Sequence, residues 1–600
     1  MDQILKKYCP RIDFESYEDF FENFRIEEPE NFNFAYDVVD EWTRLDPEKR
    51  ALVWCDDTGD TLTLTFAQMT RLSDKLASAL VARGLHKGSV VMLLLRQRWE
   101  FWVIACALWK IGAVMVPGTV MLTTKDLIYR GESCGAEALI AVDDDYALEQ
   151  VDAARADLPA IRDYILVGLE SDGGHSPARV SAEDCVARML AGDGAGAATP
   201  LAPTDDAALS LADAGRPGWL DFDRLLASGS PAWTRPTGEA ATTNSDMLAL
   251  YFTSGTTGQA KMVSQDMVYP LGHIMTARYW HQVEENTLHC SVSDSGWAKF
   301  GWGKLYGQWI CGATVFAYDT LKFSPTALLQ KLQDYRVRTF CVPPTMYRFM
   351  LQEDVASYDL SSVEVFTTAG EPLNADVNLR WKALTGKEIR EGFGQTETVV
   401  FIANWPWIEP RPGSLGKPAP LYGVKLLLED GTEAEDGQEG AICVTGLKEG
   451  FPPGLFTGYY KNPEKTAEAL GSDVYNSGDM AWRDPDGYYT FVGRNDDVIK
   501  CSGYRIGPFE VESALVSHPA VIESAVTAFP DPVRGLVVKA SIILSRDYEA
   551  SPELARELQD HVKKTTAPYK YPRIIEFVDD LPKTVSGKIK RAEIRDRDRG

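Results

Sequence analysis

A run of small polar residues after an apolar stretch carries the clearest chemistry in this chain. Residues 253–261 read Thr-Ser-Gly-Thr-Thr-Gly-Gln-Ala-Lys and directly follow the strand-like residues 247–252. Glycines let the backbone turn its N–H groups toward an anion, hydroxyl groups add donors, and a lysine adds positive charge. The run predicts a polyphosphate-binding loop formed by Thr253, Ser254, Gly255, Thr256, Thr257, Gly258 and Lys261.

The spacing of this loop differs from that of a Walker A motif, in which Gly, Lys and Ser or Thr stand in direct succession. Here Lys261 comes three residues after Gly258 and precedes Met262. A run rich in Gly, Ser and Thr is also typical of a plain surface loop. The phosphate assignment therefore depends on motifs elsewhere in the chain.

Five further motifs follow in a fixed order. They are Gly-Phe-Gly-Gln-Thr-Glu-Thr at 392–398, Ser-Gly-Asp at 477–479, Gly-Arg-Asn-Asp-Asp at 493–497, Ser-Gly-Tyr-Arg-Ile-Gly-Pro at 502–508 and Pro-Lys-Thr-Val-Ser-Gly-Lys at 582–588. With the phosphate loop they resemble the AMP-forming acyl-CoA synthetases of the adenylate-forming superfamily, most closely the medium-chain branch. The resemblance runs from about residue 30 to about residue 595, with an interruption around 171–217.

The resemblance implies an ATP-dependent acid–CoA ligase. Such an enzyme activates a carboxylic acid to an acyl-AMP and then transfers the acyl group to CoA, releasing pyrophosphate and AMP. The implied cofactors and co-substrates are ATP, Mg²⁺ and CoA. Negative charge gathers around the α-phosphate when the carboxylate attacks it. Positioned cations and oriented hydrogen-bond donors therefore lower the activation barrier of this step.

The same resemblance assigns roles to individual residues. Glu397 would bind Mg²⁺, which prefers one or two carboxylates together with phosphate oxygens. Asp479 would hold the ribose hydroxyls with help from Arg494, and Lys588 would bridge the acyl carboxylate and the α-phosphate. The implied catalytic residues are Lys588, Thr253 and Glu397. The other implied nucleotide-binding residues are Gly370, Glu371, Pro372, Glu391, Gly392, Phe393, Gly394, Gln395 and Thr396.

The second half-reaction would use the C-terminal part of the chain. Asp496 matches the hinge about which a small domain swings between the two half-reactions. The implied CoA-binding residues are Ser502, Gly503, Tyr504, Arg505, Arg534, Lys563, Tyr571 and Arg573.

The acyl pocket is the most individual part of the sequence. In acetyl-specific relatives a tryptophan stands at the position of Gly394, so we expect an open pocket floor here. Trp297, Lys299 and Trp302 match a segment that lines the acyl site in relatives. Two indoles and a lysine fill much volume, which favours a short, wide pocket. We therefore expect the substrate to be a branched or cyclic short- to medium-chain acid. The family resemblance implies a role in fatty acid and lipid metabolism. Dense core packing is an alternative role for the aromatic residues.

Periodicity predicts a mixed α/β fold. From about residue 61 to 170, and again after 285, helical patterns alternate with short apolar strands, which is typical of doubly wound, mostly parallel sheets. Strands dominate from about 421, so a β-rich subdomain should complete a large N-terminal domain over 1–493. We expect a hinge at 494–496 and a small mobile α+β domain over 497–600.

Residues 171–217 are rich in Ala, Gly, Ser, Asp and Pro. Such a composition buries little apolar area, and long surface insertions cost little loop entropy. We therefore expect a mobile insertion, of which residues around 185–215 could be removed with little effect on folding or turnover.

Composition narrows the class of protein. The net charge of −26 argues against a nucleic-acid partner or an anionic membrane surface. No apolar run has the length of a membrane span, and the first residues lack the apolar core of a signal peptide. The ten cysteines show no Cys-x-x-Cys spacing, so we expect reduced thiols in a cytoplasmic enzyme, either monomeric or homo-oligomeric.

Two alternatives stay open at this point. One is a stand-alone adenylating enzyme that loads the phosphopantetheine of a carrier protein, although no carrier domain follows and Arg534 and Lys563 would suit CoA. The other is a non-catalytic binding protein on the same fold, although Lys588, Glu397 and Asp479 are all present.

Overall fold

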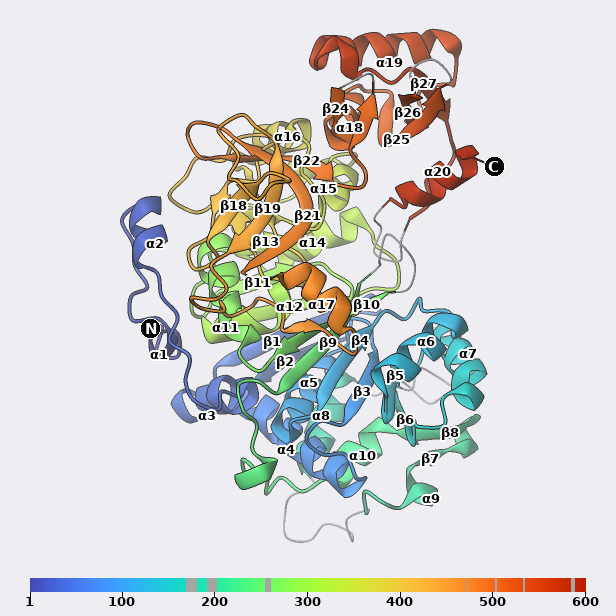
Figure 1. Cartoon of the computed structure of the whole chain (residues 1–600). Helices are drawn as coiled ribbons and strands as arrows, with labels where there is room; N and C mark the ends of the chain where they lie inside the picture. Colours follow the sequence, from blue (N-terminus) through green and yellow to red (C-terminus); the bar gives the residue numbers. More distant parts are fainter. Residues whose placement is uncertain are drawn as a thin grey trace.

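Short apolar runs form the strands at the centre of the large domain. The computed structural model (Figure 1) describes residues 1–168, 181–191, 202–253, 260–471, 473–501, 504–531, 535–583 and 589–599. The runs Val-Val-Met-Leu-Leu and Ala-Leu-Ile-Ala-Val are buried at every position. Continuous burial of this kind is typical of parallel strands that are covered on both faces.

One nine-stranded sheet carries the predicted phosphate loop. Its spatial order is β20 (Gly458–Tyr459), β10 (Lys261–Asp266), β9 (Met247–Thr253), β4 (Val114–Gly118), β3 (Val90–Leu94), β5 (Ala138–Val142), β6 (Asp163–Val167), β8 (Arg216–Asp221) and β7 (Ser210–Leu211). The strands from β9 to β8 run parallel, whereas β10, β20 and β7 pair antiparallel at the two edges.

A second nine-stranded sheet lies beside it. Its order is β17 (Lys417–Pro418), β16 (Ile402–Ala403), β15 (Ile389–Phe393), β14 (Val365–Thr368), β13 (Thr339–Cys341), β11 (Leu288–Ser291), β12 (Thr314–Asp319), β1 (Arg50–Asp56) and β2 (Thr61–Thr65). Its central strands are parallel and its edges antiparallel. The predicted doubly wound, mostly parallel architecture is confirmed.

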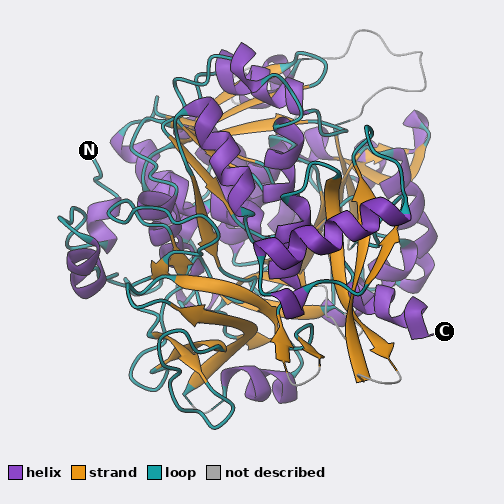
Figure 2. Cartoon of the chain, turned by 90° about the horizontal axis from the view of Figure 1, so that it is seen from above, coloured by secondary structure: helices purple, strands orange, loops and turns teal. Residues whose placement is uncertain are grey.

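Helices cover both sheets and share the main core between them (Figure 2). The helices of this core are α4 (Phe66–Ala82), α5 (Glu100–Ile111), α11 (Tyr269–Ile274), α12 (Ala298–Lys304) and α13 (Tyr306–Ile310). The outer layers are α6 (Thr124–Cys134) and α7 (Asp145–Ala154) on one sheet, and α14 (Pro325–Asp334), α15 (Pro344–Met350) and α16 (Ala375–Thr385) on the other. Every residue of α5 is buried, as expected for a helix enclosed on all sides.

A β-rich subdomain and a small α+β domain complete the chain. The subdomain sheet has the order β18 (Val424–Leu427), β19 (Gly440–Thr445), β21 (Val474–Arg483) and β22 (Tyr489–Arg494), with α17 (Pro463–Leu470) beside it. The small domain contains β23 (Ile499–Cys501), β24 (Tyr504–Ile506), α18 (Pro508–Val516), β25 (Val521–Asp531), β26 (Gly535–Leu544), α19 (Pro552–Thr565), β27 (Ile574–Phe577) and α20 (Arg591–Arg599). Phe509 of the small domain packs against Phe491 of the large one, with ring centroids 6.0 Å apart.

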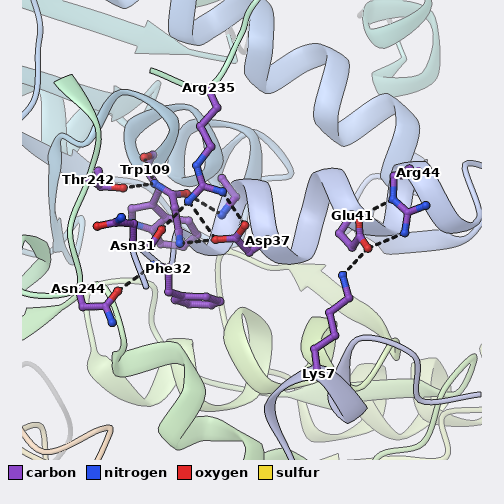
Figure 3. A network of polar contacts seen from close by, with 12 residues as sticks. Lys7, Asn31, Phe32, Asp37, Glu41, Arg44, Trp109, Arg235, Thr242 and Asn244 are labelled. Atoms are coloured by element: carbon purple, nitrogen blue, oxygen red, sulfur yellow. Dashed lines mark hydrogen bonds and ion pairs between the residues drawn. The ribbon is translucent and has the colours of Figure 1, made fainter. Parts of the chain in front are cut away.

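The N-terminal segment fixes the chain that leads into β9. Its helices are α1 (Leu5–Tyr8), α2 (Tyr17–Asn23) and α3 (Glu41–Leu45). Arg235 Nη1 lies 2.6 Å from Asp37 Oδ1, and Asn244 Oδ1 accepts a hydrogen bond of 2.8 Å from the N–H of Phe32 (Figure 3). Residues just before β9 are therefore tied to the N-terminus, which helps to hold the strand that carries the phosphate loop.

The described part of the predicted insertion is packed, in contrast to the mobile loop that its composition suggests. It contains α8 (Ala182–Ala191), α9 (Asp206–Leu209) and β7, followed by α10 (Phe222–Ser228). Val186 and Met189 are 2% and 3% exposed, and Lys75 Nζ donates to the carbonyl of Met189 at 2.9 Å. The alanine-rich composition does not reveal this helix, whose Val186 and Met189 are buried and whose Leu190 is partly buried against the same core.

Among the described residues, no helix has both the length and the apolarity that crossing a bilayer requires.

Candidate active site

The phosphate loop lies between two paired strands. Thr253 at the end of β9 is the register partner of Lys261 at the start of β10. Because β9 runs parallel to β4, the loop leaves the carboxyl edge of the sheet, where ligands of α/β proteins bind. Tyr129 of α6 donates to the carbonyl of Ala260 at 2.8 Å and fixes the loop's end. The predicted loop residues Ser254, Gly255, Thr256, Thr257 and Gly258 lie outside the described residues.

The two residues predicted to hold the ribose lie on the subdomain sheet, and a residue from the loop after β15 contacts one of them. Asp479 on β21 is 5% exposed, and its neighbour in the β22 register is Arg494, whose Nε lies 3.8 Å from Asp479 Oδ1. Gln395 Nε2 donates to Asp479 Oδ2 at 2.6 Å, and Tyr475 donates its hydroxyl to Gln395 Oε1. The carboxylate is thus oriented by an amide and an arginine, an arrangement suited to accept hydrogen bonds from paired hydroxyls.

Glu397 lies where the two sheets approach each other. Its Oε1 accepts a hydrogen bond of 2.9 Å from the hydroxyl of Tyr459, and its carbonyl accepts from the N–H of Phe456 at 2.8 Å. The described residues contain no cluster of three His, Cys, Asp or Glu side chains that could hold a metal. A single half-buried carboxylate with one oxygen bonded by a neutral donor fits Mg²⁺, which takes its other ligands from phosphate oxygens and water.

The adenine segments meet beside the ribose site. Gly370 follows β14 with a φ of +103°, a conformation that favours glycine. The carboxylate of Glu371 accepts from Thr345 at 2.9 Å, while Pro372 follows in the same turn. Phe393 packs edge-on against Phe401 with centroids 5.3 Å apart.

Glu391 is the most strongly perturbed carboxyl of this region. Its side chain is 4% exposed, and Oε1 accepts one hydrogen bond of 3.0 Å from the N–H of Leu373. Burial raises the pKa of Glu391 to about 8. The neighbouring Gly392 is required by packing, because a Cβ there would lie 2.5 Å from the ring of Trp280.

The acyl segment differs from the sequence expectation at one point. A Cβ on Gly394 would lie 2.7 Å from Cη2 of Trp302 and 2.2 Å from the carbonyl oxygen of Val399. The expected open floor beside Gly394 is therefore filled by the Trp302 indole, which is 5% exposed. The sequence could not show this, because Trp302 and Gly394 are distant in the chain and meet only in the folded protein.

Lys299 connects the acyl segment to the adenine segment. Its Nζ donates to the carbonyl of Ala369 at 2.7 Å, directly before Gly370. This contact gives the half-buried ammonium a partner, and an unpaired buried charge would be costly. Trp297 is half-buried and directly precedes α12, and Lys299 is the second residue of this helix.

Three of the predicted CoA residues lie together in the small domain. Lys563 Nζ lies 4.4 Å from the ring centroid of Tyr571, and Arg573 Cζ lies 4.9 Å from it. Arg573 also donates to the Tyr571 hydroxyl at 2.7 Å. Two cations around one aromatic ring suit a phosphorylated nucleotide.

The structure describes only some of the other site residues predicted in the C-terminal part of the chain. Tyr504 and Arg505 form β24, which pairs with β23. Ser502, Gly503, Arg534 and Lys588 lie outside the described residues.

Sequence reasoning missed three residues that hold the site together. They are Gln265, which donates to the carbonyl of Thr396 at 2.8 Å, together with Tyr459 and Tyr475. A tyrosine in an apolar strand is ordinarily a core residue, so no local signal marks these side chains. Only their contacts with residues 395–397 in the folded protein identify these side chains as part of the site.

A loop between two strands at the carboxyl edge of a mostly parallel sheet, together with a buried carboxylate close to an arginine, is typical of a nucleotide-binding enzyme. Comparison with known proteins gives its family. The family model described as "AMP-binding enzyme" matches residues 39–460, and "AMP-binding enzyme C-terminal domain" matches residues 510–588. The chain belongs to the AMP-binding enzyme family.

The names of similar proteins agree with this family assignment. The chain is 40% identical over 591 residues to "Acyl-coenzyme A synthetase ACSM3, mitochondrial" of Mus musculus, covering 97% of this chain and 93% of that protein. It is 40% identical over 581 residues to "Acyl-coenzyme A synthetase ACSM5, mitochondrial" of Homo sapiens, covering 95% and 91%.

Solved structures share the fold. The anthranilate CoA ligase AuaEII in complex with anthranoyl-AMP superposes with a TM-score of 0.80 at 27% identity, covering 95% of this chain and 98% of that one. A benzoate CoA ligase from Burkholderia xenovorans LB400 gives a TM-score of 0.74 at 26% identity, covering 94% and 100%.

These likenesses identify an AMP-forming acid–CoA ligase whose reaction uses ATP, Mg²⁺ and CoA. The carrier-protein alternative is not favoured. The expectation of a cytoplasmic enzyme is contradicted, because the curated relatives are mitochondrial. That expectation used the lack of a secretory signal core and of cysteine motifs, and neither observation distinguishes one reducing compartment from another.

Proposed function

We propose that this ligase acts on a short- to medium-chain monocarboxylic acid with a branched or cyclic acyl group. The packing of Trp302 against Gly394 carries the proposal. The indole fills the space through which a long straight chain would pass, so the acid must occupy a short, wide space near Trp297 and Lys299. Each buried methylene contributes about 0.8 kcal/mol, which favours acids larger than acetate.

A small aromatic acid belongs to the same proposal. The two solved structures described above are ligases of anthranilate and benzoate, which are flat and short acids. The Lys299 ammonium already donates to the Ala369 carbonyl. This contact favours a pocket for a monocarboxylic acid over a pocket for a dicarboxylic acid, whose second carboxylate would need a free cation.

In the proposed nucleotide site, Glu397 supplies the carboxylate for Mg²⁺ bound to the ATP phosphates. Bound Mg²⁺ would neutralise charge on the polyphosphate. Asp479 and Arg494 would hold the ribose, and Lys261 with the Thr253 loop would hold the β- and γ-phosphates. Lys588 would neutralise charge between the acyl carboxylate and the α-phosphate during adenylation.

The proposed CoA site lies on the small domain. Lys563, Tyr571 and Arg573 form a cation–aromatic cluster that suits the CoA nucleotide. A mitochondrial location is proposed from the names of the relatives, and fractionation of the native cells would test it.

A substrate panel tests the proposal directly. Release of pyrophosphate and AMP would be measured with ATP, Mg²⁺, CoA and each of acetate, butyrate, isobutyrate, 2-methylbutyrate, benzoate, octanoate and palmitate. We expect the highest kcat/KM for a branched four- to six-carbon acid or benzoate. Preference for acetate or palmitate would contradict the pocket assignment, whereas pyrophosphate release without thioester formation would contradict the use of CoA.

A further inference from the structure

Tyr459 stands between two groups of opposite charge in the proposed ATP site. It lies on β20, where its register partner is Val263 of β10. Lys261 precedes Val263 by two residues and therefore points to the same face of the sheet. Lys261 Nζ lies 4.7 Å from the centroid of the Tyr459 ring, and the Tyr459 hydroxyl lies 2.9 Å from Oε1 of Glu397.

The tyrosine hydroxyl donates a hydrogen bond to the Glu397 carboxylate. Tyr459 is 7% exposed, and its hydroxyl lies 2.9 Å from Oε1. Among the described residues, none forms a hydrogen bond with Oε2 of Glu397.

The backbone on either side of Glu397 is held by other groups. Gln265 Nε2 donates to the carbonyl of Thr396, and the N–H of Phe456 donates to the carbonyl of Glu397, both at 2.8 Å. With the backbone fixed, the orientation of the carboxylate itself depends on Tyr459.

The ring also keeps the two charges apart. Within the described part of the chain, Lys261 and Glu397 form no ion pair with each other; the aromatic ring lies between them. A direct ion pair would compete with the phosphates and the cation for both side chains. The cation–aromatic contact holds the ammonium without neutralising it.

We propose that Tyr459 is a positioning residue for ATP–Mg²⁺, orienting the Glu397 carboxylate toward the cation and the Lys261 ammonium toward the phosphates. The inference rests on the proposed function of Glu397 and Lys261. It assigns a role in nucleotide binding to a tyrosine that otherwise has the burial of an ordinary core residue.

The test is calorimetric binding of a non-hydrolysable ATP analogue, with Mg²⁺ and with EDTA, to the full-length protein. Tyr459→Phe keeps the ring and removes only the hydroxyl. Because hydrogen bonds to charged groups are stronger than neutral ones, we expect binding with Mg²⁺ to weaken about tenfold, with binding in EDTA nearly unchanged. Tyr460→Phe, on the adjacent residue, should match wild type in both conditions.

A double-mutant cycle separates positioning from a structural effect. In a Glu397→Gln background, Tyr459→Phe should cause no further loss of Mg²⁺-dependent affinity.

Three outcomes would overturn the inference: unchanged Mg²⁺-dependent affinity in Tyr459→Phe, an equal loss with Mg²⁺ and with EDTA, or additive losses in the double variant. If wild type itself binds the analogue no better with Mg²⁺ than with EDTA, the proposed role of Glu397 fails instead. The two failures are thus distinguishable.

Discussion

At the scale of single residues, close packing around Gly394 limits the shape of the proposed acyl site. The site tolerates no side chain at this position, since a Cβ would meet a backbone carbonyl that cannot move aside. A tryptophan introduced there would damage packing before it could reshape the pocket. The residue that can be changed is Trp302.

Trp302→Leu should admit longer straight-chain acids, because the shorter side chain vacates the space beside Gly394. Loss of the buried ring should also lower the free energy of unfolding by about 2–5 kcal/mol. The ratio of kcat/KM for octanoate to that for isobutyrate would be compared with wild type. An unchanged ratio in a folded variant would show that Trp302 only packs the core.

Glu391→Gln should remove a pH dependence of stability. The folded pKa of about 8 lies above the usual 4.5, so the folded protein binds this proton more tightly than the unfolded chain. The resulting stabilisation is complete below about pH 4.5 and is lost as the pH rises through about 8. The glutamine can still accept the Leu373 hydrogen bond.

Urea unfolding at several pH values would check this expectation. The free energy of unfolding of wild type should fall relative to that of Glu391→Gln between about pH 5 and pH 8. Parallel curves for the two proteins would contradict the assignment of a buried, protonated Glu391.

At the scale of elements, α8 shows that a low-complexity composition can contain a structural helix. Val186→Ala together with Met189→Ala removes two buried side chains and should destabilise the large domain by about 2–5 kcal/mol. Arg188→Ala, on the exposed face of the same helix, is the matched control. Melting temperatures would be compared, and equal values for all three proteins would restore the view of a dispensable insertion.

At the scale of the whole molecule, hydrogen bonds on either side of Asp496 favour this residue as the hinge. The N–H of Asn495 donates to the carbonyl of Gly478 in the large domain at 3.0 Å. Arg595 of α20 binds Asp497 at 2.5 Å, so the chain belongs to the small domain from that point. Asp496 lies between these two attachments.

Asp496→Pro should block the rotation between half-reactions, because proline fixes φ near −65°. We expect adenylation, measured by pyrophosphate exchange, to remain largely intact, and thioester formation from supplied acyl-AMP to fall by at least about tenfold. Equal losses in both steps would indicate misfolding and leave the hinge unsupported.

Lys588→Ala should give the opposite pattern. In the proposed function its charge serves only the adenylation step, so we expect pyrophosphate exchange to be abolished while supplied acyl-AMP still yields the thioester. If both half-reactions survive, or both are lost equally, Lys588 does not have this role.

The sequence by itself determined the local features of this protein. Helices α5 and α19 follow from local sequence, since Gly112 ends α5 in the left-handed conformation and Ser551 caps the start of α19. The predicted phosphate loop and the 392–398 motif are recognisable for a similar reason, because the residues that characterise each of them are consecutive in the chain.

Only the tertiary structure decided which distant side chains meet. Tyr459 and Glu397 are 62 residues apart, and Gln395 and Asp479 are 84 apart. Trp302 fills the space at Gly394, and α8 buries a face that its composition conceals. Such contacts depend on how sheets and helices pack together, and the spacing of residue types along the chain does not predict that packing.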